Sequence, residues 1–465
     1  MATLTQSFID EKTIFETLEK HRRPDKARVL AVLDKARELK GLTPDETAVL
    51  LQAGSPEFDE LVFPAAREVK LAIYGRRLVL FAPMYITNEC RNSCLYCAFR
   101  RENTGLKRKT LTMDEVRAET RALVMQGHKR ILMVYGESCG IDYITDTIAA
   151  VYDTKVDNGE IRRVNVNLAP LSVDDFKTLK GAGIGTYQCF QETYHLDTYR
   201  KMHPSGPKAN FEWRLFALDR AQQGGIDDVA VGVLFGLYDW KFEILALLQH
   251  VAHLEREFGV GPHTISFPRM EPAMGSDISL HPPHEVSDLD MKRLVAILRL
   301  AVPYTGMILT TREQPDMRRA LMDLGTSQLS AGSRTHPGAY SEDHREHAPD
   351  VEQFTLGDTR PLDAVIRDIA DMGYMPSFCT GCYRLGRTGG DFMDLAKPGL
   401  IQKFCLPNAM LTFKEYLIDY ASEATREAGL RAIQEQMPDI PTEKRRLETQ
   451  ERLRRIEQGE RDLYF

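Results

Sequence analysis

The sequence predicts an α/β protein built on a (β/α)8 barrel of the TIM type, with a helical cap before it and a mostly helical extension after it. Eight short apolar runs alternate with segments of helical apolar spacing between residues 79 and 332. Eight such units spread over about 260 residues match a (β/α)8 barrel in number and length. A doubly wound sheet is the alternative, and in either fold the reactive residues lie at the C-terminal ends of the strands.

Each predicted strand is a short run rich in aliphatic, aromatic or β-branched residues. The runs are Val79–Thr87, Arg130–Tyr135, Arg162–Leu168, Gly185–Glu192, Asp228–Phe235, His263–Pro268, Gly306–Thr311 and Ser327–Gly332. Between them, apolar residues recur three and four positions apart, as on one face of a helix. These segments are Thr112–Gly127, Asp142–Asp157, Val173–Ala182, Phe211–Gly224, Glu243–Phe258, Asp288–Ala301 and Gln314–Asp323. The first begins with Thr112-Met-Asp-Glu115, a capping box that satisfies the free backbone donors of a helix start.

The pattern divides the chain into three predicted parts. Residues 1–78 are expected to form an N-terminal helical cap, because they contain three segments with helical apolar spacing. Residues 79–345 form the predicted barrel. Residues 346–465 form a C-terminal domain that ends in charged, solvated helices.

Composition excludes several classes of function. The 465 residues carry a net charge of −7, so there is no overall positive charge to attract nucleic acid. Residues 1–10 lack the basic and apolar regions of a secretory signal, and no apolar run is long enough to span a membrane. We therefore expect a cytoplasmic protein with no nucleic-acid or membrane partner. Its eight cysteines are then typical of metal ligands; six form two groups, and Cys139 and Cys189 are expected to be buried small side chains.

The first cysteine group follows the first predicted strand. Cys90, Cys94 and Cys97 are close enough in the chain for one tight loop to bring three thiolates to one inorganic centre. A four-iron cluster takes four ligands, so three cysteines leave one iron open to a small molecule. A zinc site is the alternative, but zinc motifs add a second cysteine pair or a near histidine, and the nearest downstream histidine is His128.

This CxxxCxxC spacing, with the aromatic Tyr96 before the last cysteine, resembles the signature of the radical S-adenosylmethionine (SAM) superfamily. The resemblance implies that Cys90, Cys94 and Cys97 hold a 4Fe–4S cluster and that Tyr96 lies with the bound cofactor. It also implies that the open iron chelates the amine and carboxylate of SAM, and that reduction releases a 5′-deoxyadenosyl radical. The cofactors would supply the chemistry, and the protein would orient them and exclude water.

Two strand ends carry candidate SAM ligands. The second strand ends in Tyr135-Gly-Glu137, which resembles the GGE motif that holds the SAM amine, with Tyr135 in place of the first glycine; a turn acid is the alternative. The fourth strand ends in Glu192, and the next helix carries Arg214. An acid and an arginine can bind the ammonium and carboxylate of a zwitterion, and in related radical SAM enzymes such residues bind the methionyl part of SAM. A surface salt bridge is the alternative for this pair.

The seventh and eighth strands end in residues suited to an amino-acid carboxylate. Arg312 follows the seventh strand and Ser330 lies near the end of the eighth. We predict that this guanidinium and hydroxyl hold the substrate carboxylate. The alternatives for Arg312 are an ion pair with Glu313 or a role in stabilising the barrel rim.

A second cysteine group lies in the C-terminal part of the chain. Cys379 and Cys382 form a CxxC pair, and Cys405 follows after 22 residues. The glycines between them suit a chain that wraps around a bound group. A structural zinc completed by a histidine or an acid is the alternative.

Together the two groups resemble the HydG family of tyrosine lyases, which help to assemble the active-site cluster of FeFe-hydrogenase. The related ThiH family of thiazole biosynthesis shares the first motif but lacks the second. The resemblance implies cleavage of the Cα–Cβ bond of L-tyrosine to p-cresol and dehydroglycine. It further implies conversion of dehydroglycine to carbon monoxide and cyanide at an auxiliary 4Fe–4S cluster held by the second cysteine group.

In that family the auxiliary cluster carries an extra labile iron, held partly by a histidine and a free cysteine. The position that matches this histidine is His263, which on its place in the chain alone would be a core residue. The resemblance also implies a reductant such as flavodoxin or ferredoxin, and other hydrogenase maturases as partners.

Two other functions fit parts of the sequence. A lyase of the ThiH type, or one acting on another aromatic amino acid, would release dehydroglycine without forming carbon monoxide or cyanide. A non-catalytic cluster carrier or electron-transfer module would also hold two clusters. The open iron and the Glu192–Arg214 pair argue against such a carrier, and reductive cleavage of bound SAM would exclude it.

Overall fold

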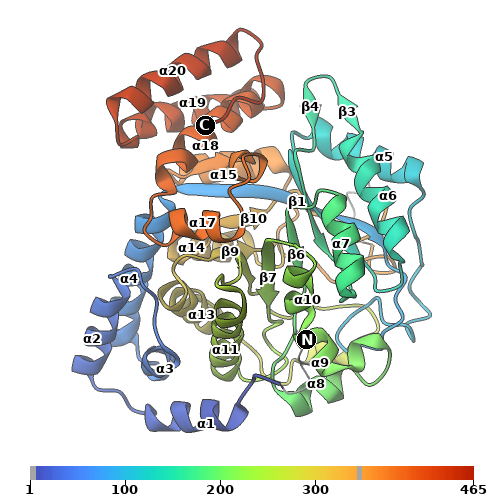
Figure 1. The fold of residues 1–465 in the computed structure, drawn as a ribbon, viewed down its shortest axis with the longest axis vertical. Helices are drawn as coiled ribbons and strands as arrows, with labels where there is room; N and C mark the ends of the chain where they lie inside the picture. Colours follow the sequence, from blue (N-terminus) through green and yellow to red (C-terminus); the bar gives the residue numbers. More distant parts are fainter. Residues whose placement is uncertain (1–6, 343–347) are drawn as a thin grey trace.

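The computed structural model describes residues 7–342 and 348–465 and contains a closed barrel of eight parallel strands (Figure 1). In order around the barrel these are β1 Arg77–Thr87, β2 Arg130–Tyr135, β5 Arg163–Asn167, β6 Thr186–Gln188, β7 Asp228–Gly232, β8 Thr264–Ser266, β9 Gly306–Leu309 and β10 Gln328–Ser330. The last strand pairs with the first in parallel, with Leu80 opposite Leu329. The predicted (β/α)8 barrel is therefore confirmed, and the doubly wound alternative is wrong because such a sheet stays open.

All eight predicted strands are present, and six of them end one to four residues earlier than predicted. The largest difference is in β6, which was expected to continue to Glu192 but ends at Gln188. Beyond that point a single bridge joins Glu192 to Val233, the residue after β7. Glu192 itself adopts a left-handed backbone with φ of 70°.

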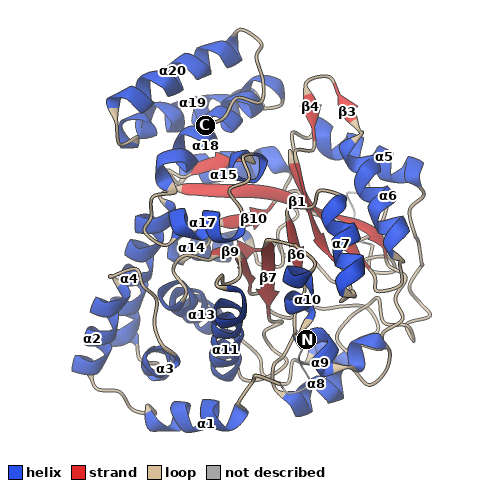
Figure 2. Ribbon diagram, viewed as in Figure 1, coloured by secondary structure: helices blue, strands red, loops and turns tan. Residues whose placement is uncertain are grey.

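Helices surround the barrel and follow its strands, as Figure 2 shows. The main ones are α5 Met113–Met125, α6 Ile141–Tyr152, α7 Val173–Gly181, α8 Leu196–Met202, α9 Phe211–Leu215, α10 Ala217–Gln223, α11 Trp240–Phe258, α13 Asp288–Ala301 and α14 Pro315–Leu324. The predicted capping box of Thr112 and Glu115 is present at the start of α5. One predicted helix, Phe211–Gly224, is divided into α9 and α10 at Phe216.

The N-terminal cap consists of α1 Glu11–Lys20, α2 Lys26–Ala36, α3 Pro44–Gln52 and α4 Pro56–Tyr74. It packs on the outer helices of the barrel: Arg293 of α13 binds Asp59 of α4 at 2.7 Å, and the ammonium of Lys70 donates to the main-chain oxygen of Met322 at 2.9 Å. The cap is therefore helical, as predicted. The boundary predicted at residue 345 falls in 343–347, which lie outside the described residues, as do residues 1–6 of the predicted cap.

The C-terminal extension is mostly helical but contributes a ninth strand. Its elements are α15 Leu362–Asp371, β11 Met375–Ser377, α16 Gly381–Arg384, α17 Gly389–Ala396, α18 Gln402–Asp419, α19 Glu423–Gln436 and α20 Glu443–Glu457. Strand β11, which sequence reasoning missed because it has only three residues, pairs in parallel with the beginning of β1. This pairing brings the second cysteine group to the N-terminal end of the barrel, opposite the end near α8 and α9 (Figure 1).

Among the described residues, no helix is both long enough and apolar enough to cross a membrane.

Candidate active site and second cysteine site

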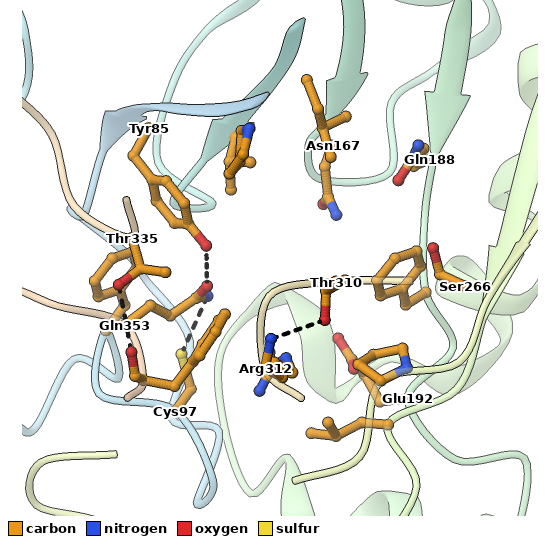
Figure 3. A pocket seen from close by; sticks show the side chains of 18 of the residues that line it. Tyr85, Cys97, Asn167, Gln188, Glu192, Ser266, Thr310, Arg312, Thr335 and Gln353 are labelled. Atoms are coloured by element: carbon orange, nitrogen blue, oxygen red, sulfur yellow. Dashed lines mark hydrogen bonds between the residues drawn. The ribbon is translucent and has the colours of Figure 1, made fainter. Parts of the chain in front are cut away.

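A cavity of about 1410 Å³, counting the open space at its mouth, lies at the C-terminal end of the barrel (Figure 3). Strand-end residues from around the barrel line it, together with the first cysteine loop. Its lining includes all the residues predicted for this site: Cys90, Cys94, Tyr96, Cys97, Glu137, Glu192, Arg214, Arg312 and Ser330. The structure thus gathers these residues in one place, whereas their individual roles remain predictions.

The cysteine loop is held in place by Asn92, a buried residue that sequence reasoning missed. Its side-chain amide donates to Glu137 Oε2 at 2.7 Å, and its side-chain oxygen accepts from the main-chain N–H of Lys208 at 2.8 Å. The same amide group lies 3.7 Å from the sulfur of Cys90, and the amide of Gln353 lies 3.7 Å from the sulfur of Cys97. Such N–H groups near cysteine sulfur tune the potential of an iron–sulfur cluster.

Two of the three thiols are costly to ionise without a metal. Burial raises the pKa of Cys97 to about 11 and raises the pKa of Cys94 further, so both are protonated at neutral pH in the free protein. A bound iron supplies the positive charge that favours the thiolate. Buried cysteines of this kind therefore fit ligands of a cluster rather than free nucleophiles.

A network of four charged side chains lies beside the cysteine loop. Arg214 donates to Glu137 Oε1 at 2.8 Å and lies 3.9 Å from Glu192 Oε1, which accepts from the ammonium of Lys208 at 2.6 Å. These side chains are only 4 to 12 % exposed, so the alternative of a surface salt bridge for Glu192 and Arg214 is wrong. In such a buried network the two acids can bind the ammonium of a zwitterionic ligand, and the two bases can bind its carboxylate.

The charges of this network determine the protonation of its members. Burial would raise the pKa of Glu137, but Arg214 and Lys208 outweigh it and the pKa is lowered. Burial and Arg214 would lower the pKa of Lys208, but Glu192, Cys94 and Glu137 together outweigh them and the pKa is raised. Lys208 was missed from the sequence because it lies in a loop with no periodic pattern.

The local backbone conformation places the side chains of Glu192 and Glu137 in the cavity. The left-handed conformation of Glu192 costs of order 1–3 kcal/mol and persists only when neighbouring contacts hold it. Glu243 at the start of α11 supplies these contacts: it accepts from the main-chain N–H of Tyr194 at 2.9 Å and from the hydroxyl of Thr193. Gly136, next to Glu137, is also required, because a Cβ there would lie 2.1 Å from the main-chain oxygen of Glu89.

Arg312 and Ser330 line the same cavity, and Figure 3 shows Arg312 within it. The Arg312 guanidinium lies 3.4 Å from the centre of the Phe354 ring and has no hydrogen-bond acceptor among residues 7–342 and 348–465. Glu313 binds Arg269 instead, at 2.7 and 2.9 Å, so the alternative pairing of Arg312 with Glu313 is wrong. The Arg312 guanidinium is thus free to bind a ligand carboxylate.

Ser330 does not contact Arg312, so the predicted pair is two separate groups on one cavity wall. Its oxygen accepts from the main-chain N–H of Thr311 at 3.2 Å, which leaves the hydroxyl hydrogen free to donate. Glu271, which sequence reasoning missed, lines the cavity as well, and burial raises its pKa to about 7 in spite of the nearby Arg312.

The second cysteine group lines a separate cavity of about 560 Å³, counting its mouth, at the N-terminal end of the barrel. His263, directly before β8, lines the same cavity, so the structure brings the predicted histidine to Cys379, Cys382 and Cys405. Burial lowers the pKa of His263 to about 4, and its Nδ1 has no hydrogen-bond partner. The Asp228 carboxylate lies 3.4 Å from this Nδ1 without forming a hydrogen bond. A neutral imidazole with a nitrogen that makes no hydrogen bond is suited to bind a metal ion.

Positive charge surrounds this second cavity. Its lining includes Arg77, Arg130, Arg163 and Arg387 but only one acid, Asp228, which leaves an excess of three positive charges. Three cysteine thiolates would balance that excess. Three of the arginines, Arg77, Arg130 and Arg163, are the first residues of β1, β2 and β5, and Arg387 comes from the extension.

Both cysteine groups were also expected to have a zinc site as the alternative. Across the part of the chain that the structure describes, no three histidine, cysteine, aspartate or glutamate side chains converge on one point. In an iron–sulfur cluster each thiolate binds a different iron, so the cysteines of such a site are spread around the cluster.

The remaining two cysteines differ from each other. Cys189 is buried, as predicted, whereas Cys139 is half-buried in the loop before α6, so the prediction of a fully buried Cys139 is wrong. A loop after a strand end has fewer neighbours to cover it than a strand interior has.

The two cavities follow one another along the barrel interior. On several strands the residue that lines the second cavity is followed, two positions later, by one that lines the first, because alternate residues of a barrel strand point inward. These pairs are Val79 and Phe81, Arg130 and Leu132, Gly306 and Ile308, and Gln328 and Ser330.

Comparison with known protein families gives two matches. Residues 84–250 match the Radical SAM superfamily, and residues 266–375 match the Biotin and Thiamin Synthesis associated domain. The first match contains the CxxxCxxC loop, Glu137, Glu192 and Arg214.

Individual proteins extend this likeness to the whole chain. The 2-iminoacetate synthase of Escherichia coli K12 is 29% identical over 364 residues, which are 77% of this chain and 93% of that protein. A crystal structure of HydG, a maturase of the [FeFe]-hydrogenase, is 51% identical with a TM-score of 0.95 and covers 99% of this chain and 100% of its own. The HydG structure from Carboxydothermus hydrogenoformans is 38% identical with a TM-score of 0.83, covering 95% and 97%. With half of its residues identical over nearly its entire length, this chain belongs to the HydG family of radical SAM proteins.

Proposed function

We propose that this protein is a tyrosine lyase with two linked sites. At the C-terminal end of the barrel it cleaves the Cα–Cβ bond of L-tyrosine to p-cresol and dehydroglycine. At the N-terminal end, carbon monoxide and cyanide are formed from dehydroglycine and bound to iron for assembly of the FeFe-hydrogenase active site. One observation carries the proposal: a single closed barrel has a three-cysteine cavity at each end.

At the first site, Cys90, Cys94 and Cys97 would hold a 4Fe–4S cluster, with Tyr96 beside it. When bound, the cluster and SAM supply a 5′-deoxyadenosyl radical that takes a hydrogen atom from the substrate. Glu137, Glu192, Arg214 and Lys208 would hold the methionyl part of SAM, since their buried network offers both charges to a zwitterion.

The tyrosine substrate would lie between this network and the opposite wall. The free guanidinium of Arg312 and the hydroxyl of Ser330 would bind its carboxylate. Ring stacking fixes Arg312 on Phe354, so the guanidinium is oriented before the ligand arrives. The walls of the barrel exclude water from the radical.

At the second site, Cys379, Cys382 and Cys405 would hold an auxiliary 4Fe–4S cluster. His263 would bind an additional labile iron together with a free cysteine, since its unpartnered nitrogen lines the same cavity. The arginines of this cavity would balance the thiolates. We further propose a cytoplasmic protein of three parts, residues 1–78, 79–345 and 346–465, with flavodoxin or ferredoxin as reductant and other hydrogenase maturases as partners.

The second candidate is a lyase that releases dehydroglycine and goes no further. The likeness to 2-iminoacetate synthase over 77% of the chain favours it. The second cysteine cavity, with its histidine and arginines, argues for the longer reaction.

The test is anaerobic turnover of the reconstituted protein with SAM, dithionite and L-tyrosine, with p-cresol, cyanide and carbon monoxide measured together. The variant Cys379→Ala/Cys382→Ala is assayed beside it. Cys139→Ala is the matched control, because this half-buried cysteine lines neither cavity.

We expect all three products from the native protein and from the control, and p-cresol without carbon monoxide from the double variant. If the native protein makes p-cresol but neither carbon monoxide nor cyanide, the second candidate, a lyase that releases dehydroglycine, is the correct function. If it makes no p-cresol, the tyrosine lyase proposal fails.

A further inference from the structure

The last residues of the chain fold back onto the second cysteine site. After α20 the chain turns at Asp462, a left-handed residue with φ of 63°, and runs along the extension. We define residues 462–465 as the tail. Its contacts reach both segments that carry the cysteines of this site.

The tail first contacts the CxxC segment. Asp462 forms an ion pair with Arg384, which lies two residues after Cys382. The ring of Tyr464 lies 5.2 Å from the same guanidinium. The backbone of Gly381, between the two cysteines, lies so close that a Cβ there would be 3.5 Å from Cβ of Tyr464.

The tail then contacts the segment that carries Cys405. The main-chain N–H of Phe465 donates to the side-chain oxygen of Asn408 at 2.8 Å. Asn408 is buried and lies three residues after Cys405 on α18, so both side chains are on neighbouring positions of one helix face. The main-chain oxygen of Phe465 also accepts from Arg387, a residue of the cavity wall, at 2.8 Å.

Two further interactions anchor the tail itself. Arg445 and Arg452 of α20 lie 4.1 and 3.5 Å from the centre of the Phe465 ring. The main-chain N–H of Asp462 donates to the buried Glu415 of α18 at 2.6 Å. The tail is therefore a fixed element and not a loose end.

We propose that the tail is a positioning element for the second cluster: it clamps the Cys379–Cys382 segment against Cys405 and so sets the spacing of the three thiolates. The consequence for cluster binding rests on the function proposed above. The clamp itself is a property of the protein before any metal binds.

The extension also has contacts that do not involve the tail. Strand β11 pairs with β1, and the main-chain N–H of Phe378 donates to the hydroxyl of Thr412 on α18 at 3.2 Å. A chain that lacks residues 462–465 should therefore fold, while its CxxC segment opens more often.

The experiment compares the metal-free full chain with two variants, a deletion of residues 462–465 and Asp462→Ala. Thiol alkylation with iodoacetamide is followed cysteine by cysteine by mass spectrometry. Loss of a few contacts should increase opening of a local segment about tenfold. We thus expect Cys379, Cys382 and Cys405 to react about tenfold faster in the deletion variant, with a smaller increase in Asp462→Ala.

The first cysteine group is the internal control, because the tail does not touch it. Glu460→Ala is the matched variant: it removes an exposed ion pair with Arg455, two residues before the tail, that reaches neither cysteine segment. Its alkylation rates should equal those of the full chain.

Iron content after reconstitution is the second measurement. We expect the deletion variant to retain the first cluster and so to hold about half of the iron of the full chain. Unchanged alkylation of Cys379, Cys382 and Cys405 would overturn the proposal, as would equal acceleration of all six cysteines. Accelerated alkylation of the second group in a protein whose full chain never binds a second cluster would uphold the clamp and refute the proposed function.

Discussion

The two ends of the barrel hold the same number of cysteines in opposite electrostatic surroundings. The cavity at the C-terminal end contains three acids and three bases, whereas that at the N-terminal end contains four arginines and one acid. A balanced set of charges suits ligands that carry both signs, such as SAM and an amino acid. An excess of positive charge suits thiolates and an anionic cluster.

The two sites also differ in how they are built. The first site is assembled from strand ends and their following loops, as in other (β/α)8 enzymes. The second lies at the N-terminal end of the barrel, where functional sites are unusual. An added strand, the helical extension and the tail build it. Changes at one end should therefore leave the other end intact.

The largest effect is expected for Cys94→Ala at the first end. Without this buried cysteine the first cluster loses a ligand, and formation of 5′-deoxyadenosine from SAM should fall by at least about 10³-fold, the loss expected when a chemical group essential to a step is removed. Iron bound at the second end should remain, as measured by iron analysis and electron paramagnetic resonance. Parallel loss of both clusters would show that the two ends are not independent.

At the second end, His263→Ala should remove the labile iron and with it most carbon monoxide formation. Even a residue that only supports a metal ligand contributes about 10–100-fold to metal affinity or activity, so loss of the ligand itself should lower carbon monoxide formation at least about tenfold. Formation of p-cresol should stay within twofold of the native rate. His128→Ala is a suitable control, since this buried histidine lies in neither cavity. A fall in p-cresol formation equal to that in carbon monoxide formation would contradict the separation of the two sites.

Lys208→Met tests the balanced charges at the first end. Removing one partner of a buried ion pair leaves the carboxylate of Glu192 uncompensated, which costs about 2 kcal/mol or more in binding. We expect SAM affinity, measured by equilibrium dialysis, to fall about 30-fold. Lys201→Met, an exposed lysine of the neighbouring helix α8, should bind SAM as the native protein does. Equal affinity of both variants would contradict a role for Lys208.

The last prediction concerns stability rather than activity, at Glu243, which holds the backbone beside Glu192. Burial raises the pKa of Glu243 to about 8, whereas an exposed glutamate has a pKa near 4.5. Between these values the folded protein keeps a proton that the unfolded chain releases, so stability falls as pH rises from about 4.5 to about 8, by at most about 1.4 kcal/mol per pH unit.

Denaturant unfolding of Glu243→Gln between pH 5 and pH 8 measures this contribution. The amide cannot ionise but can still accept from Tyr194, so the slope of stability against pH should flatten relative to the native protein. Glu257→Gln, an exposed substitution on the same helix, should keep the native slope. Identical slopes in all three proteins would show that Glu243 is not protonated in the fold.

Most of the barrel was predictable because its signals are local. Each strand is a short apolar run, and each helix shows its own spacing and caps, so eight units could be recognised without knowledge of their neighbours. Strand ends were less predictable. After the early end of β6 the chain makes a left-handed turn at Glu192, which Glu243 stabilises from a helix 50 residues away in the chain.

The residues of the candidate site also divide into those that the local sequence predicts and those that only tertiary contacts place. The cysteine spacing and the acids at strand ends could be read directly, because they follow from the position of a loop after a strand. Lys208, Asn92 and Glu271 could not, since each reaches the cavity from a loop with no repeating pattern. Their contribution depends on contacts across the barrel.

The sequence by itself therefore determined the number of barrel units, the two cysteine groups and the residue types able to bind a zwitterion. These properties depend on neighbours in the chain. Only the tertiary structure decided that the two groups lie at opposite ends of the barrel, that arginines surround one of them, and that the tail reaches both of its segments. The reason is physical: strand pairing, burial and ion pairing join residues hundreds of positions apart, and spacing along the chain does not specify them.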